Sequence, residues 1–173
     1  QQYFIKHGRY TAGLSVKYTP STLTGLGDWQ HLASGFEVGT RFHSAPVIRL
    51  ADAKPLQLGH TVKADARWRL YAFAGSEDPA LPQSDIKKFC NFLQTSVESP
   101  LQKFTPHKED SNTVIEVMAV FQQSHQDLDI GAMPDLLRPK VGLLQLTDYE
   151  KMFCADQVAG DIYTMRGVDR KRG

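Results

Sequence analysis

Runs of apolar residues predict a strand, a helix and a second strand in the middle of the chain. Residues 67 to 75 read Arg-Trp-Arg-Leu-Tyr-Ala-Phe-Ala-Gly, and after Arg69 apolar side chains fall on both faces of the pleat. That pattern is typical of a buried strand covered by helices on both sides. Residues 114 to 121 are apolar apart from Glu116 and predict a second buried strand. Because a helix separates the two strands, we expect them to be parallel, with a right-handed crossover.

The helix between these strands is expected from Ser84 to about Ser99. Ser84 is a favourable N-cap residue, Asp85 suits the positive end of the helix dipole, and Pro100 is expected to end the helix. Apolar residues recur three and four positions apart, which predicts one stripe facing the core. The stripe consists of Ile86, Phe89, Cys90, Leu93 and Val97.

Shorter elements are expected on either side of this unit. Short alternating runs at 47 to 50 and 56 to 58 predict a hairpin, and residues 151 to 155 predict a third strand. Residues 1 to 11 fit the last turns of a helix, and residues 127 to 137 fit a polar turn with one helical turn. A short helix is expected over residues 157 to 166, with one face formed by Val158, Ile162 and Met165.

Residues 20 to 45 are rich in Gly, Ser and Thr and carry three large aromatic side chains, Trp29, Phe36 and Phe42. This composition predicts an ordered but irregular segment that lies on another surface. We interpret the three aromatic residues as anchors at that interface, with ligand contact as the alternative.

Composition and charge exclude several classes of function. The chain has 173 residues, enough for one domain with an extension. Its 20 basic and 19 acidic residues give a formal net charge of +1, which argues against binding nucleic acid by bulk electrostatics. No stretch approaches the roughly 18 apolar residues of a membrane span. The chain begins without Met or a signal-peptide pattern, so we expect a segment of a longer protein.

Two cysteines bear on the redox environment. Cys90 lies on the apolar stripe of the expected helix, and Cys154 lies in the apolar run Met152-Phe153-Cys154. We expect both to be small buried hydrophobic residues rather than a disulfide or reactive thiols. A reducing, cytoplasmic compartment is therefore favoured.

The sequence contains no complete motif for nucleotide binding, calcium binding, metal binding or nucleophilic catalysis. The pair Gly25 and Gly27 lacks the third glycine and the leading strand of a dinucleotide-binding loop, and there is no Gly-x-Ser-x-Gly motif. Asp127, Asp129 and Asp135 lack the glycine and glutamate of a calcium loop. None of the histidines has a partner at metal-ligand spacing; they are His7, His31, His43, His60, His107 and His125.

A basic cluster near the C-terminus, Arg166, Arg170, Lys171 and Arg172, could contact phosphates. In a chain of almost zero net charge, a solvated end is the favoured interpretation. The residues alone therefore predict a soluble α/β domain without a catalytic site of its own.

Several phrases resemble the C-terminal region of the FAD-dependent aromatic hydroxylases, the family that acts on compounds such as phenol and 3-hydroxybenzoate. Residues 31 to 47 are similar to the family's G-x-R-x-x-x-A-P stretch, and residues 68 to 75 to the strand that follows it. Residues 161 to 173 resemble its Y-x-x-x-G-(I/V)-D-x-x-x-G signature. Residues 9 to 13 and 18 to 21 resemble the exit from the preceding substrate domain.

The resemblance implies an α/β, thioredoxin-like sheet with flanking helices and an irregular N-terminal extension. Thioredoxin-type enzymes carry Cys-x-x-Cys where the strand meets the helix, but here the junction from Gly75 to Ser84 has no cysteine. Residues 1 to 45 would be the tail of the preceding domain with a connecting segment, and 46 to 173 the thioredoxin-like domain. The family pattern continues into a further strand after residue 173, so we expect the final strand to be missing here.

The function implied is a non-catalytic structural and dimerisation domain of an FAD- and NADPH-dependent monooxygenase. FAD and NADPH would be bound by the preceding domains, and no catalytic, cofactor-binding or metal-binding residue is carried over to this chain. The expected partners are those domains and a second copy of the protein, not nucleic acid or a membrane. The alternatives are a free thioredoxin-like or peroxide-reducing enzyme, which needs a thiolate at the junction, and a polyanion-binding module built on residues 166 to 172.

Overall fold

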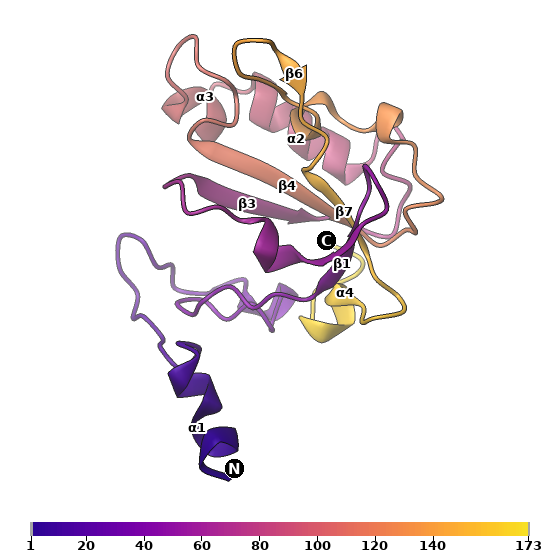
Figure 1. Ribbon diagram of the computed structural model, residues 1–173. Coiled ribbons are helices and arrows are strands. Elements are labelled where there is room, and N and C mark those ends of the chain that lie inside the picture. Colours follow the sequence, from indigo (N-terminus) through magenta and orange to yellow (C-terminus); the bar gives the residue numbers. More distant parts are fainter. Residues whose placement is uncertain (1, 173) are drawn as a thin grey trace.

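A five-stranded mixed sheet lies at the centre of the structure (Figure 1), a computed structural model that describes residues 2–172. Across the sheet the strands follow the order β2-β1-β7-β4-β3. Their bounds are β1 (Pro46–Arg49), β2 (Pro55–Gln57), β3 (Trp68–Phe73), β4 (Ile115–Phe121) and β7 (Met152–Ala155).

Strand directions confirm the expected supersecondary units. Strands β3, β4 and β7 run parallel, and β3 and β4 are joined through two helices, α2 (Asp85–Thr95) and α3 (Pro100–Phe104). Strands β1 and β2 form the antiparallel hairpin, and β1 also pairs antiparallel with β7. The fold is thus mixed α/β, consistent with a thioredoxin-like arrangement.

Strand β4 divides the hydrophobic core into two layers. Its alternate side chains Val117, Ala119 and Phe121 face α2 and α3, while Met118 and Val120 face the opposite layer. This strand is buried along almost its whole length. Strand β3 was expected to be equally buried, but it is an edge strand of the sheet within residues 2–172 and is only half-buried. Apolar residues on both faces of a strand therefore show that other elements cover both faces of the sheet there. They do not show whether the strand lies inside the sheet or at its edge.

The long helix predicted from Ser84 to Ser99 is two helices. Ser84 caps α2 as expected, and Ile86, Cys90 and Leu93 are buried, but α2 ends at Thr95. The Ser99 hydroxyl donates to the Leu93 carbonyl at 2.6 Å and accepts from the Leu101 amide at 3.1 Å. It thereby closes one helix and caps the next, with Pro100 at the first position of α3. Val97 lies between the helices and is 80% exposed, so its place on the core stripe was wrong.

The second face of the sheet is covered by an irregular segment and a short helix. Residues 33 to 45 join this layer of the core although they carry little regular structure. The amide of Gly35 donates to the carbonyl of Arg166 at 2.8 Å, and a Cβ at Gly35 would lie 2.6 Å from the Arg166 Cα. Only a glycine fits that approach. The boundary at residue 45 stays a prediction, since this segment packs on the following domain.

Helix α4 (Ile162–Met165) is shorter than the helix predicted over 157 to 166. Ile162 is buried, as predicted, but Val158 is 97% exposed and Met165 is half-exposed. The carboxylate of Asp156 accepts from the amides of Val158 and Ala159, which makes this stretch a turn.

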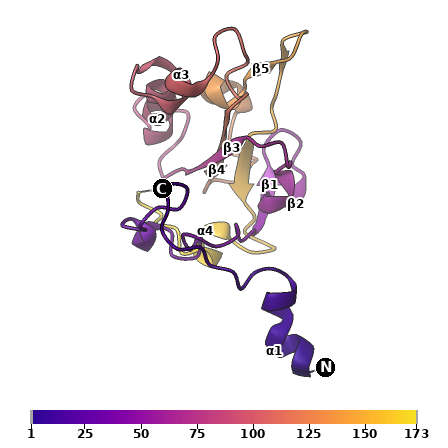
Figure 2. The same cartoon turned by 90° about the vertical axis from the view of Figure 1, so that its left-hand side faces the viewer.

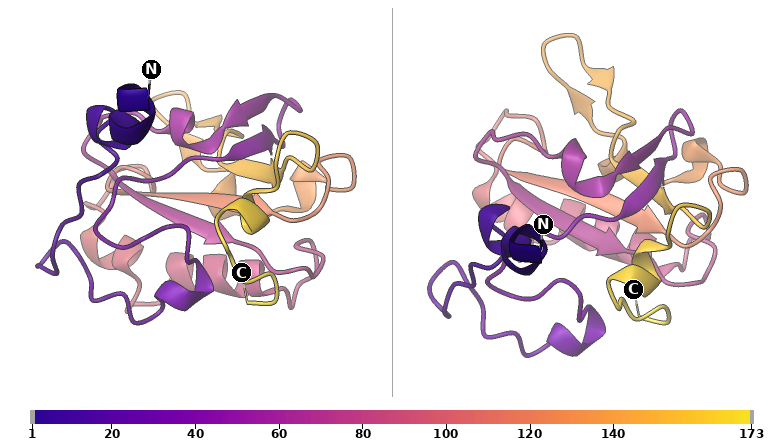
Figure 3. Two further views of the ribbon diagram at one scale, coloured as in Figure 1. Left: turned by 90° about the horizontal axis from the view of Figure 1, so that it is seen from below. Right: turned by 60° about the horizontal axis from the view of Figure 1, so that its bottom comes forward.

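Two elements extend away from the core. Helix α1 (Gln2–Thr11) projects from one end and buries none of its residues (Figures 1 and 2). A small hairpin of β5 (Lys140–Val141) and β6 (Leu146–Thr147) projects from the other end (Figure 3). Within residues 2–172, no helix combines the length and apolar character needed to cross a membrane. The single-turn 3₁₀ helices are η1 (Gln30–Leu32), η2 (Leu58–Thr61), η3 (Ile130–Ala132) and η4 (Asp135–Leu137).

Candidate docking surfaces

At the junction between β3 and α2, a carboxylate binds the N-terminal end of the helix. The Glu77 side chain accepts a hydrogen bond from the amide of Asp85, the first residue of α2. The Ser84 hydroxyl accepts from the amide of Lys87 at 3.4 Å and donates to the carbonyl of Pro79 at 3.1 Å. These side chains satisfy the helix amides that would stabilise a thiolate in a redox enzyme.

Both cysteines lie in the core as expected. Cys90 and Cys154 are free thiols and fully buried on the α2 side of the sheet. Burial raises the pKa of each thiol to about 12, because a thiolate would lose its hydration there. Neither sulfur is therefore a reactive nucleophile at neutral pH.

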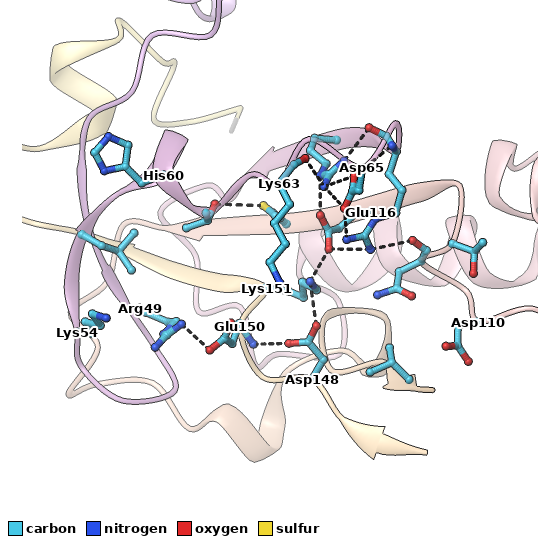
Figure 4. A pocket seen from close by; sticks show the side chains of 18 residues that line it. Arg49, Lys54, His60, Lys63, Asp65, Asp110, Glu116, Asp148, Glu150 and Lys151 are labelled. Atoms are coloured by element: carbon cyan, nitrogen blue, oxygen red, sulfur yellow. Dashed lines mark hydrogen bonds and ion pairs between the residues drawn. The ribbon is translucent and has the colours of Figure 1, made fainter. Parts of the chain in front are cut away.

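A polar cleft of about 720 Å³ lies across the other end of β3 and β4 (Figure 4). At its floor the buried carboxylate of Glu116 meets three cations. Its Oε1 lies 3.1 Å from Nη1 of Arg67 and 2.5 Å from Nζ of Lys151. Its Oε2 lies 2.6 Å from Nε of Arg69, but the N–H of that nitrogen is not aligned for a hydrogen bond. Lys151 also pairs with Asp148 at 2.9 Å.

The charges of this cleft stabilise one another. Asp65 pairs with both arginines, and its hydrogen bond to Arg67 holds the pKa of this carboxyl well below its usual range. At the rim, the hydrogen bond from Arg49 lowers the pKa of Asp52 to about 2. Among the described residues, no three histidine, cysteine or acidic side chains are placed to hold a metal ion. We interpret the cleft as a structural ion network that joins β3, β4 and the start of β7.

The three aromatic residues singled out in the sequence have different positions. Phe36 and Phe42 stack with ring centroids 5.0 Å apart, and Phe42 stacks on Tyr71 of β3 at 4.7 Å. Phe36 also contacts Phe73 at 5.4 Å. These two residues anchor the irregular segment to the sheet of their own chain. Trp29 is 72% exposed and available to another surface. A role of the three at an interface stays a prediction.

The C-terminal basic cluster is partly engaged within the chain. Arg166 donates to the carbonyl of Ser44. Arg170 pairs with Asp161, donates to Gln122 at 3.1 Å and lies over the ring of Tyr163. Lys171 and Arg172 are exposed. Two of the four cations are thus held by intrachain partners, which makes this cluster a poor polyanion site.

Exposed apolar side chains gather on the N-terminal segment. They follow one another along α1 and the loop after it, and none contacts the two core layers. Exposed apolar patches are typical of interaction sites, and an interface on this segment stays a prediction. The residues are Tyr3, Phe4, Ile5, Tyr10, Tyr18, Leu23, Leu26 and Trp29.

A second exposed apolar group lies on the β5–β6 hairpin and was missed in the sequence. Leu143, Leu144 and Leu146 are all exposed, and Tyr149 beside them is partly so. The signal was available as a leucine-rich, uncharged run, but the run is too short to show helix or strand periodicity.

The structure is thus a mixed α/β domain with two buried thiols and with exposed apolar side chains on two separate segments. The chain belongs to the family described as phenol hydroxylase, C-terminal dimerisation domain, whose model matches residues 16–173.

Two relatives carry this domain as part of a longer protein. A 3-hydroxybenzoate 4-monooxygenase of Comamonas testosteroni is 50% identical over the whole chain, which matches the C-terminal part of that protein and 27% of its length. The FAD-dependent monooxygenase terD of Aspergillus terreus is 29% identical over 98% of the chain and 28% of its own length. The chain therefore spans about a quarter of the length of these monooxygenases.

Proposed function

We propose that this chain is the structural and dimerisation domain of an FAD- and NADPH-dependent aromatic-ring monooxygenase that acts in the cytoplasm as a homodimer. Its substrate would be 3-hydroxybenzoate or a related phenol. The main support is the 50% identity, over the entire chain, to the C-terminal part of a 3-hydroxybenzoate 4-monooxygenase. The family description as a dimerisation domain supports the role of this segment.

The described residues do not fit a flavin. The pair Gly25 and Gly27 lies in an exposed loop without a preceding strand or a following long helix, so it does not form the phosphate cradle of a dinucleotide fold. We therefore place FAD and NADPH on the preceding domains. The chemistry of ring hydroxylation would belong to the flavin, while this domain contributes assembly.

The contribution of the domain would be apolar burial. A large aromatic side chain buries about 150–250 Å² when it enters an interface. Trp29 contributes nothing to its own core and can therefore give most of its surface to a partner. We expect the N-terminal segment, which carries Trp29, to pack against the preceding domains of the same polypeptide, because the chain matches the C-terminal part of the 3-hydroxybenzoate 4-monooxygenase and its N-terminal end would connect to them.

The proposal is tested on the full-length protein. We expect flavin absorbance, a dimeric mass by light scattering, and NADPH oxidation that depends on 3-hydroxybenzoate or phenol. Trp29→Ala should weaken assembly while turnover per bound flavin stays nearly unchanged. The matched control is Trp68→Ala, which removes the other exposed tryptophan, on the edge strand β3. A large fall in flavin-normalised turnover at unchanged mass would contradict a purely structural role for Trp29.

A free redox enzyme is not supported by the geometry. It requires an accessible low-pKa thiol, whereas both cysteines are buried with raised pKa values.

A further inference from the structure

The tip of the β5–β6 hairpin is a tight turn with leucines at its centre. The amide of Gln145 donates to the carbonyl of Gly142 at 3.0 Å, which places Leu143 and Leu144 at the two central positions. Glycine, proline, asparagine and aspartate are the residues that favour such positions. Here Leu143 is 99% exposed and Leu144 is 77% exposed.

The turn is held in one shape by its surroundings. The carboxylate of Asp110 accepts from the amide of Gly142 at 2.7 Å and from the Gln145 side chain at 3.5 Å. The same side-chain amide donates to the Gly142 carbonyl at 2.9 Å. Gly142 and Gln145 both have positive φ, at 70° and 50°. Because these hydrogen bonds already order the backbone of the turn, little backbone conformational entropy would be lost when the leucines bind a partner.

These leucines do nothing for the fold of their own chain. The hairpin has two strands of two residues each, and its leucines belong to neither layer of the core. Figures 1 and 3 show it standing clear of the sheet. A hairpin of this size is marginal by itself in water, so an ordered, apolar tip indicates a surface that another molecule covers.

We propose that the β5–β6 tip, Leu143, Leu144 and Leu146, is a contact between two copies of this chain. This inference rests on the proposed dimerisation function and names the surface that carries it. A two-fold interface brings the same patch of both subunits together. Residues 141 to 147 contain no charged side chain, and the nearby Asp110 carboxylate accepts hydrogen bonds from Gly142 and Gln145. The exposed leucines of two tips can therefore meet without a charged side chain between them.

The other apolar surface fits self-contact less well. Helix α1 carries Lys6 and Arg9 among its exposed apolar residues, so two copies would place like charges together. It also lies at the end of the molecule opposite the hairpin (Figures 1 and 2). We therefore assign the hairpin, and not α1, to the second copy.

The test uses the full-length protein and a double substitution, Leu143→Asp with Leu144→Asp. Neither side chain packs in the core, so the monomer should fold unchanged, while facing carboxylates should oppose association. We expect the dimer dissociation constant, measured by sedimentation equilibrium, to rise at least about 100-fold, the effect of losing a central interface contact. Val158→Asp is the matched control, because Val158 is equally exposed on a different turn.

The outcomes separate the two proposals. A wild-type protein that is monomeric at all concentrations overturns the dimerisation function itself. A dimeric wild type whose double variant is equally dimeric overturns only the assignment of the hairpin.

A second measurement avoids disruptive substitutions. Cysteine introduced by Leu144→Cys can be labelled selectively with a maleimide, because Cys90 and Cys154 are buried. We expect labelling to slow at least about tenfold when protein concentration rises from below to above the dimer dissociation constant, as the tip leaves solvent. Val158→Cys should react at one rate throughout. Protection of the introduced cysteine that is independent of concentration would show a contact within one polypeptide and overturn the proposal.

Discussion

The hydroxyl oxygen of Tyr163 lies 2.7 Å from the carbonyl oxygen of Val120, which ties helix α4 to the interior strand β4. The carbonyl of Ala74, just after β3, lies 2.8 Å from the same hydroxyl. One hydroxyl proton is thus shared between two acceptors in a fully buried site. Tyr163 thereby fixes the ends of β3 and β4 relative to the C-terminal part of the chain.

Replacing Tyr163 by Phe should destabilise the protein by about 1–3 kcal/mol, because the buried carbonyls lose their hydroxyl donor. The measurement is the free energy of unfolding in urea. Tyr149→Phe is the control, since Tyr149 is partly exposed and should change stability by less than about 0.5 kcal/mol. Equal stability of the two variants would show that the hydrogen bonds of Tyr163 contribute nothing net.

Replacing Glu116 by Gln should cost more, about 3–5 kcal/mol, because Arg67, Arg69 and Lys151 would keep their charges without the central carboxylate. Chemical denaturation again gives the change. Glu150→Gln removes a carboxylate that pairs with Arg49 at 2.6 Å but is mostly exposed, so its effect should stay below about 1 kcal/mol. A small effect of the Glu116 substitution would mean that water or neighbouring carboxylates replace the lost partner.

The two thiols should be unreactive in the native protein and become reactive only on unfolding. Burial raises the pKa of each thiol to about 12, whereas the pKa of an unfolded cysteine is about 8.5. The stability that comes from burying neutral thiols is therefore complete below about pH 8.5 and is lost as pH rises toward 12. Thiol titration with and without denaturant checks the first expectation, and urea midpoints between pH 8 and 11 check the second. Rapid labelling of native Cys90 at neutral pH would revive a redox function.

The ion pair between Arg49 and Asp52 should make stability fall in acid. The folded pKa of Asp52 is lowered to about 2 by the Arg49 hydrogen bond, below the roughly 3.9 of an unfolded aspartate. A lowered pKa contributes stability above about pH 4 that disappears as pH falls toward 2. The urea midpoint of Asp52→Asn should therefore lie below that of the wild type at pH 6, and the two should converge near pH 2. A constant difference across this range would assign the effect to something other than charge.

Local patterns in the sequence were sufficient for the parallel strand–helix–strand unit, the first hairpin and the burial of both cysteines. They failed where one side chain serves two elements. Ser99 closes α2 and caps α3, so Pro100 begins a helix, although a proline after a periodic stretch equally well ends one. Val97 continues the apolar period of α2 in the sequence but lies outside the helix.

Long-range relationships were not accessible from the sequence. Apolar residues on both faces of 67 to 75 and of 114 to 121 look alike, yet β4 is an interior strand and β3 an edge strand. The order of strands in the sheet decides this, and local sequence does not encode that order. The pairing of Glu116 with Arg67, Arg69 and Lys151 likewise depends on which strands are neighbours. The leucines at the turn of the second hairpin stand where polar residues or glycine are usual. Sequence patterns therefore do not identify this segment as a turn.

The Glu77 carboxylate at the start of α2 has a consequence for protein engineering. Cysteines introduced at the junction of β3 and α2 would lie near the negative charge of Glu77. That charge raises the pKa of a thiol and so opposes formation of the nucleophilic thiolate. Converting this scaffold into a disulfide oxidoreductase would therefore require a neutral residue at position 77 before any cysteine is added.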